Sequence, residues 1–176
     1  MINLSYVWSD GPKSPTWVKT EPYGPEQKTI LQFYFHEITT GDSATIQLIA
    51  QAQPSAANYT VTDFGDLYMA DNPLTMGPEL NSTLVGRAQG FYGSASQNVW
   101  SYIMGLTYNF VDGIYNGSSL SILGLNSIVN PVREYPVVGG TGVFRMARGY
   151  VLAQTYMFDP NLGIVIIGYN VTIFHS

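Results

Sequence analysis

Short runs of apolar and β-branched residues follow one another along most of this chain. Isoleucine, valine, threonine and aromatic residues dominate the runs, a composition that favours extended strands. No segment repeats its apolar residues every three to four positions, so long helices are not expected. The predicted strands are 29–38, 44–51, 64–70, 85–93, 99–111, 119–123, 144–158 and 164–174.

Clusters of glycine, proline, asparagine and aspartate separate these runs and predict turns. The clusters include Thr40-Gly41-Asp42, Asn72-Pro73, Asn116-Gly117 and Asp159-Pro160-Asn161. Residues 1–28 are rich in proline and show little periodicity. We therefore expect an extended N-terminal arm over 1–28 and one β domain over 29–176.

The length and spacing of the strands suit a closed antiparallel barrel or a two-sheet sandwich. We favour the barrel, because eight strands enclose an interior just large enough for one small ligand. Glycines inside the predicted strands, at positions 90, 105, 149 and 168, indicate bends or close approaches between backbones.

The composition limits the partners of such a domain. Charged residues make up 11% of the chain, against roughly 25% in an average globular domain, so self-association is expected to cover part of the surface. The net charge of −5 argues against nucleic acid and anionic membranes as partners. The absence of cysteine excludes disulfides, thiol catalysis and thiolate metal sites.

Sites for N-glycosylation bear on where the protein is found. The start of the chain lacks the apolar core of a signal peptide, which leaves a removed signal or a cytosolic protein as alternatives. Five sequons favour a secreted glycoprotein, although the last one falls inside a predicted strand. They begin at Asn3, Asn58, Asn81, Asn116 and Asn170.

Two familiar kinds of site find little support in the sequence. The histidines, His36 and His175, are too few for a metal centre, and we interpret His36 as a packing or hydrogen-bonding group. The segment 137–142, VVGGTG, resembles a phosphate loop, but a strand and not a helix follows it. We interpret it as a tight turn between strands that requires positive φ angles.

Charged residues inside apolar strands are the informative candidates. They are Glu37, Asp66, Arg133 and Arg148. Burying a charge is costly unless the charge is paired or functional. Each alone is best explained as an ion pair or a solvated position, and we expect an ion pair for Arg148. Together they predict polar groups that converge in an apolar, aromatic pocket.

Short blocks in a fixed order cover about residues 29–175. The blocks are FYFHE at 33–37, FGD at 64–66 with DNPLT at 71–75, VGRAQGFY at 85–92, VRE at 132–134 with VVGGTG at 137–142, and MARG at 146–149. Together they resemble the dirigent proteins of plants. The resemblance implies an eight-stranded antiparallel barrel, as in allene oxide cyclase-like folds, that forms homotrimers. It also implies export to the apoplast or cell wall, and no metal or organic cofactor.

The resemblance also assigns candidate site residues. In the family, an acid at the end of the first block, a tyrosine ending the VGRAQGFY block and an arginine in the VRE block are placed in the pocket. Here these are Glu37, Tyr92 and Arg133. Where lignan-forming members carry a second acid, this chain has Asn126. We expect Glu37, Arg133 and Asn126 to be catalytic, and the substrate-binding residues to be Tyr92, Asp66 and Phe35.

Asn126 in place of an acid points to the branch of the family that includes pterocarpan synthases. Members of that branch dehydrate isoflavanols to pterocarpans through a quinone methide, as cofactor-free lyases. Glu37 would then donate a proton to the departing hydroxyl, while Arg133 and Asn126 stabilise a phenolic oxygen. Burial would raise the pKa of Glu37 and a nearby Arg133 would lower it, and the sequence leaves that balance open.

Three activities fit a phenol-binding barrel. The first is the dehydration and ring closure just described. The second is guidance without turnover, in which a separate oxidase supplies phenoxy radicals and the protein sets the stereochemistry of lignan or other biaryl coupling. The third is a carrier similar to lipocalins. Asn126 favours the first over the second, and the ordered blocks argue against a plain carrier.

Overall fold

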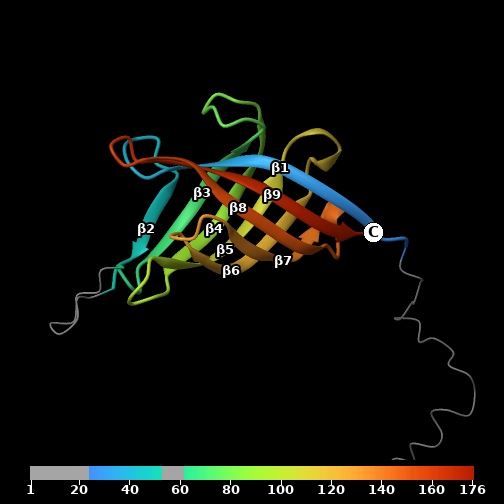
Figure 1. Cartoon of the computed structure of the whole chain (residues 1–176). Helices are drawn as coiled ribbons and strands as arrows, with labels where there is room; N and C mark the ends of the chain where they lie inside the picture. The colour runs from blue at the N-terminus through green and yellow to red at the C-terminus, as the bar shows by residue number, and fades with distance from the viewer. Residues whose placement is uncertain (1–23, 53–61) are drawn as a thin grey trace, which may run out of the picture.

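The computed structural model describes residues 24–52 and 62–176, which form a closed antiparallel β-barrel (Figure 1). Its strands are β1 (Gln27–Ile38), β2 (Ile46–Ala50), β3 (Leu67–Thr75), β4 (Leu84–Ser94), β5 (Ser101–Phe110), β6 (Ser119–Ser127), β7 (Arg133–Thr141), β8 (Arg148–Asp159) and β9 (Ile164–His175). Two 3-10 segments, η2 (Gly113–Tyr115) and η3 (Gly142–Phe144), lie between strands.

Pairing between β1 and β3 closes the barrel. The sheet runs in the order β1-β9-β8-β7-β6-β5-β4-β3, and the contacts Tyr34↔Thr75 and Phe35↔Leu74 join its two edges. The closed barrel therefore has eight strands, as predicted, and closure leaves no long unpaired edge among the described strands. The short β2 is additional and pairs only with β3.

One barrel strand, β7, was not predicted, and the predicted strand 44–51 is instead the short β2 outside the closed barrel. The segment 137–142 was expected to be a turn, but residues 137–141 complete β7, and the turn follows at η3. Gly139 and Gly140 pair with Ser121 and Leu120 of β6. A β-carbon at Gly140 would lie 2.4 Å from the Phe144 carbonyl oxygen, so this strand needs glycine for close approach. Within this segment, Gly142 alone has the positive φ, +61°, that the turn interpretation required.

The predicted break at Asn72-Pro73 is also wrong, because both residues lie inside β3. Beside them β3 changes partners, from β2 at Ala70 to β1 at Leu74. Pro73 lies at this changeover, where a missing N–H removes little from the ladder. The proline is therefore compatible with an uninterrupted strand.

Two of the strand glycines allow neighbouring backbones to approach closely. A β-carbon at Gly90 would lie 2.1 Å from the carbonyl oxygen of Gly105, and one at Gly149 would lie 2.0 Å from that of Thr172. No side chain fits at such distances, so the prediction of close approaches is confirmed at these positions. At Gly168 the nearest atom would be 3.7 Å away, an ordinary contact.

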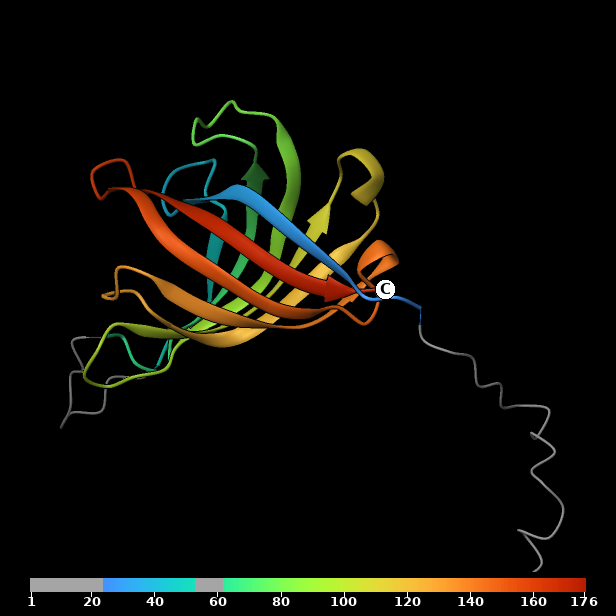
Figure 2. The same cartoon turned by 45° about the vertical axis from the view of Figure 1, so that its right-hand side comes forward.

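The two ends of the barrel differ (Figure 2). One end, near the C-terminus, is filled by packed rings: Phe33 lies 6.1 Å from Phe110, Phe110 lies 5.6 Å from Phe144, and Tyr115 stacks on Phe144 at 5.2 Å. The η2 and η3 segments bring Tyr115 and Phe144 to this aromatic end. The opposite end, here called the loop end, carries the connections 39–45, 95–100, 128–132 and 160–163.

Some sequence predictions fall largely outside the described residues. The arm over 1–28 is one of them, since only its last residues are described, and the sequons at Asn3 and Asn58 are others. Asn81 and Asn116 are exposed in loops, and Asn170 is exposed on β9. Within residues 24–52 and 62–176, no helix has the length and apolar character to cross a membrane.

Candidate active site

Strand alternation places the predicted site residues inside the barrel at the loop end. Alternate residues of each strand face inward, because the side-chain period of a strand is two. Glu37 is the last inward residue of β1, two positions beyond the buried Phe35. Tyr92 lies near the end of β4, and Arg133 begins β7. These ends of the three strands lie on the same side of the barrel, which brings residues far apart in sequence to one region.

Glu37 and Tyr92 form the acidic part of the site. A hydrogen bond from the Tyr92 hydroxyl reaches the Glu37 carboxyl, and the Glu37 side chain keeps partial exposure. Burial raises the pKa of Glu37 to about 7, and the hydrogen bond from Tyr92 only partly opposes this rise. Arg133 is not among the groups that shift this pKa. Burial therefore decides the balance that the sequence left open, and Glu37 holds a proton at mildly acidic pH.

Two further tyrosines pack against Tyr92 beside this carboxyl. Tyr68 stacks on Tyr92 with ring centres 5.2 Å apart, and Tyr102 meets Tyr92 edge-on at 5.5 Å. Burial raises the pKa of Tyr102 to about 12, with smaller effects from nearby charges including Glu37. All three rings therefore remain neutral phenols at physiological pH. Such a cage offers ring faces and hydroxyls to an aromatic ligand.

Sequence reasoning did not single out Tyr68 and Tyr102. Each tyrosine is the cross-strand partner of a residue near the site: Tyr68 pairs with Tyr92, and Tyr102 pairs with Asn126. A correct pairing of β3 with β4 and of β5 with β6 would have identified both. No motif marks them, so register was the only available signal.

Asn126 lies on the same wall of the barrel as Tyr102. Its side-chain nitrogen donates to the Met104 sulfur at 3.1 Å, and its buried side-chain oxygen has no hydrogen-bond partner among the described residues. A thioether is a weak acceptor, so this amide is held loosely. An unsatisfied amide oxygen can accept a hydrogen bond from a hydroxyl of a bound ligand.

Arg133 forms a second, basic part of the site. Its side chain is buried, and Nη1 donates to Thr155 Oγ1 at 2.9 Å. Thr155 pairs with Ile167, which pairs with Phe35, the inward residue before Glu37. The acidic and basic parts therefore occupy the same end of the barrel, on walls separated by β8 and β9.

The two remaining predicted binding residues have structural contacts. Asp66 is buried and its Oδ1 accepts a hydrogen bond from the Ala52 backbone at 2.8 Å, so it links the end of β2 to the start of β3. Phe35 is fully buried and packs against Tyr169 with ring centres 5.5 Å apart. Asp66 lies at the edge of the site, and Phe35 lies one inward position from Glu37 toward the aromatic end.

The structure confirms that His36 and Arg148 have structural contacts, as predicted. His36 Nε2 lies 2.6 Å from Thr75 Oγ1, in a buried hydrogen bond between β1 and β3. Arg148 forms an ion pair with Glu26 and lies 5.6 Å from the centre of the Phe174 ring. Both residues therefore contribute contacts between strands or with the chain that precedes β1.

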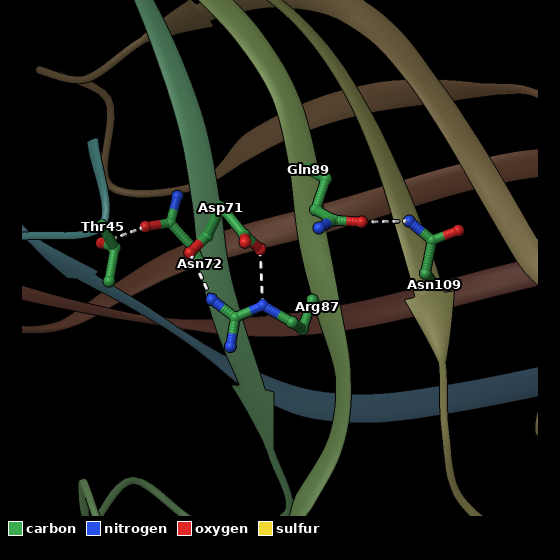
Figure 3. A network of polar contacts seen from close by, with 6 residues as sticks. All are labelled: Thr45, Asp71, Asn72, Arg87, Gln89 and Asn109. Atoms are coloured by element: carbon green, nitrogen blue, oxygen red, sulfur yellow. Dashed lines mark hydrogen bonds and ion pairs between the residues drawn. The ribbon is translucent and has the colours of Figure 1, made fainter. Parts of the chain in front are cut away.

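Several block residues form a polar network across β3, β4 and β5 (Figure 3). Asp71 pairs with Arg87 through Oδ1 and Nε at 2.5 Å, and Arg87 Nη2 donates to the Asp71 carbonyl at 2.7 Å. On the neighbouring pair of strands, Asn109 donates to Gln89 at 2.9 Å. These motif residues link strands through exposed contacts, so part of the sequence signature is structural.

Comparison with known proteins gives a consistent result. Residues 28–174 match the family described as Dirigent-like protein. Dirigent protein 23 of Arabidopsis thaliana is 45% identical over 176 residues, covering 99% of this chain and 93% of the relative. Pterocarpan synthase 1 of Glycyrrhiza echinata is 46% identical over 151 residues, covering 85% of this chain and 79% of the relative.

A solved structure shows the same architecture. The pterocarpan synthase dirigent protein GePTS1 superposes with a TM-score of 0.79 at 43% identity, and the match covers 89% of each chain. The closed eight-stranded barrel therefore agrees with the structure of a related protein.

Proposed function

The chain belongs to the dirigent family, and from this premise we propose that it binds phenolic quinone-methide intermediates and dehydrates an isoflavanol to a pterocarpan with stereochemical control. One observation carries the proposal: a carboxyl group whose pKa is raised to about 7 lies among three tyrosine rings inside the barrel. An acid with that pKa is suited to proton donation near neutral pH. The similarity to pterocarpan synthases supports the choice of reaction.

The proposed first step is loss of water. Protonated Glu37 donates its proton to the alcohol oxygen of the isoflavanol, and the carbon–oxygen bond breaks with release of water. The electron-rich phenol ring supplies the electrons and releases its own O–H proton, which gives a neutral quinone methide. Glu37 regains a proton from solvent before the next turnover, so it acts as a general acid.

The proposed second step closes the ring. A second phenolic hydroxyl of the same molecule adds to the electrophilic carbon, and a proton returns to the quinone-methide oxygen. The overall change is loss of one water. The Arg133 guanidinium and the side-chain N–H groups of Asn126 are suited to stabilise the negative charge that develops on that oxygen. The tyrosine cage fixes which face of the intermediate is attacked and keeps bulk water away from it.

The direct test uses purified protein and no oxidant. An isoflavanol is supplied as substrate, and pterocarpan formation is followed by chiral chromatography. Turnover with excess of one enantiomer is expected. Absence of turnover in a folded, monodisperse preparation would contradict the enzymatic proposal.

The same preparation tests guidance of radical coupling. Coniferyl alcohol and an oxidase replace the isoflavanol, and the enantiomer ratio of the coupled product is measured. A changed ratio at an unchanged rate would identify a guide. Binding of phenols without either effect would identify a carrier.

We also propose that the protein forms homotrimers and is exported to the apoplast. Support comes from the low content of charged residues, 11%, and from exposed apolar side chains such as Ile30 and Val132 on the surface. Light scattering should give about three times the chain mass of 19.4 kDa. Glycans at Asn81 and Asn116, which are exposed, would support export. A monomeric mass and an unmodified intracellular protein would contradict these proposals.

A further inference from the structure

Arg133 is a buried cation without an acidic partner among the described residues. Only 4% of its surface is exposed. Its one side-chain hydrogen bond within the described part of the chain goes to a neutral hydroxyl, that of Thr155, and its Nε is buried without a partner there. The ion pairs of the described residues involve Arg87 and Arg148 instead. Because an unpaired buried charge is costly, the retention of Arg133 needs a specific explanation.

Tyrosine hydroxyls take the place of a counter-ion. Tyr135 follows two positions after Arg133 on β7, so both side chains face inward from the same strand. Arg133 interacts with the Tyr135 hydroxyl and partly opposes the rise that burial causes in the pKa of Tyr135. Tyr169 and Tyr108 lie behind this pair and interact through their own hydroxyls.

These contacts are incomplete in the free barrel. The hydroxyls of Tyr108, Tyr135 and Tyr169 are all buried, and none has a hydrogen bond of good geometry to another described residue. The same is true of Arg133 Nε. The guanidinium and the Tyr135 hydroxyl are therefore adjacent without optimal alignment. Catalytic hydrogen bonds are often loose in a free enzyme and tighten when substrate binds.

We propose that Tyr135 is a positioning residue, which holds the Arg133 guanidinium in the orientation that stabilises the oxygen of the phenolic intermediate. This inference rests on the proposed function. A carboxylate partner would hold Arg133 equally well but would cancel its charge. A neutral hydroxyl orients the guanidinium and leaves its positive charge available for the substrate oxygen.

The test compares two tyrosines that are equally buried. Tyr135→Phe removes the hydroxyl beside Arg133, and the control Tyr108→Phe removes a hydroxyl that interacts with Tyr135 and Tyr169 but not with Arg133. Both residues are 0% exposed, so the two variants, which each lose one hydroxyl, should show similar changes in melting temperature. We expect Tyr135→Phe to lower kcat roughly tenfold with little change in KM, because a transition-state contact is weakened. Tyr108→Phe should keep kcat within about twofold. Equal kcat losses in the two variants would overturn the proposal.

A double-mutant cycle gives a second criterion. In an Arg133→Lys background the planar guanidinium is absent, so adding Tyr135→Phe should cost less than about twofold in kcat. A further loss of about tenfold in that background would show that Tyr135 acts independently of Arg133, which overturns the inference.

A measurement without substrate separates this inference from the proposed function. The Nε–H of Arg133 is followed by NMR, assigned by its loss in Arg133→Lys. Tyr135→Phe should shift this signal and speed its exchange with water, and Tyr108→Phe should leave it nearly unchanged. An unchanged signal in Tyr135→Phe would overturn the positioning role. A changed signal in a protein without isoflavanol turnover would support the positioning role while the proposed reaction failed.

Discussion

Glu37 and Tyr92 lie on strands that do not pair with each other, yet a hydrogen bond joins their side chains inside the barrel. β1 carries Glu37 and β4 carries Tyr92, and β3 lies between the two strands. The contact exists because closure of the barrel brings β1 against β3 and turns both side chains toward one interior. The acid therefore lies against aromatic rings and not in bulk water, which is the cause of its raised pKa.

The first prediction concerns the role of this acid in turnover. Glu37→Gln keeps the shape and the acceptor for Tyr92 but cannot donate a proton, so kcat should fall by roughly 10²–10⁴-fold. The rate of the natural protein should fall as pH rises above about 7, the pKa of Glu37, since the protonated acid is then lost. Steady-state kinetics from about pH 5 to about pH 9 measure both effects.

A matched control is available on β7. Glu134 is an exposed acid on a strand, and Glu134→Gln should leave both kcat and the pH profile unchanged. Full turnover by a folded Glu37→Gln variant would remove the acid from the mechanism.

The second prediction concerns the stability of the fold. The pKa of Glu37 is near 4.5 in an unfolded chain and about 7 in the folded protein, so the folded state favours the protonated form. The native protein should therefore lose stability as pH rises from 4.5 through about 7, by up to about 3 kcal/mol. Glu37→Gln lacks this loss, and it should be more stable than the natural protein near pH ~8 but not near pH ~4.

Chemical denaturation at the two pH values measures this difference. An advantage of Glu37→Gln that is the same under acidic and alkaline conditions would show that the carboxylate is not destabilised by burial.

The third prediction concerns the buried bond between His36 and Thr75. The Thr75 hydroxyl donates to the Gly77 carbonyl at 2.7 Å, so it must accept from His36 Nε2, which therefore carries the proton. Thr75→Val removes this acceptor of the His36 N–H and also the hydroxyl bond to the Gly77 carbonyl, and it should reduce the free energy of unfolding by about 1–3 kcal/mol. Denaturant unfolding measures the loss.

A second histidine–threonine pair provides the comparison. Thr29 Oγ1 lies 2.9 Å from His175 Nε2, but this contact is only partly buried, so water can replace the lost hydroxyl. Thr29→Val should cost clearly less than Thr75→Val. Equal losses of unfolding free energy in the two variants would mean that burial does not make the His36–Thr75 contact more important for stability.

The fourth prediction concerns close approach between β8 and β9. A β-carbon at Gly149 would lie 2.0 Å from the Thr172 carbonyl oxygen, and the backbone there cannot yield without breaking the ladder. Gly149→Ala should therefore destabilise the protein severely, by roughly 3 kcal/mol or more. Gly139→Ala is the control, because nothing lies within 4 Å of the position that its methyl group would take. Similar melting temperatures for the two variants would contradict the predicted clash.

The order of apolar and polar residues was enough to establish much of this protein. It established an all-β domain and the places of most strands, because strand alternation is a local property. The assignment of Glu37, Tyr92 and Arg133 to the pocket came from the family resemblance. The ordered blocks pointed to the family. The interpretation of His36 and Arg148 as structural residues also followed from the sequence, since two histidines are too few for a metal centre and a charge within an apolar strand needs an ion-pair partner.

The tertiary structure decided what depends on distant strands. β7 was missed because its glycines are usual in turns, and only the closeness of β6 explains them as strand residues. Tyr68 and Tyr102 joined the site through strand register, which the sequence does not reveal. The raised pKa of Glu37 depends on barrel closure, which buries the carboxyl against Tyr92. Burial and electrostatic pairing are set by which strands meet, and that is a property of the closed barrel.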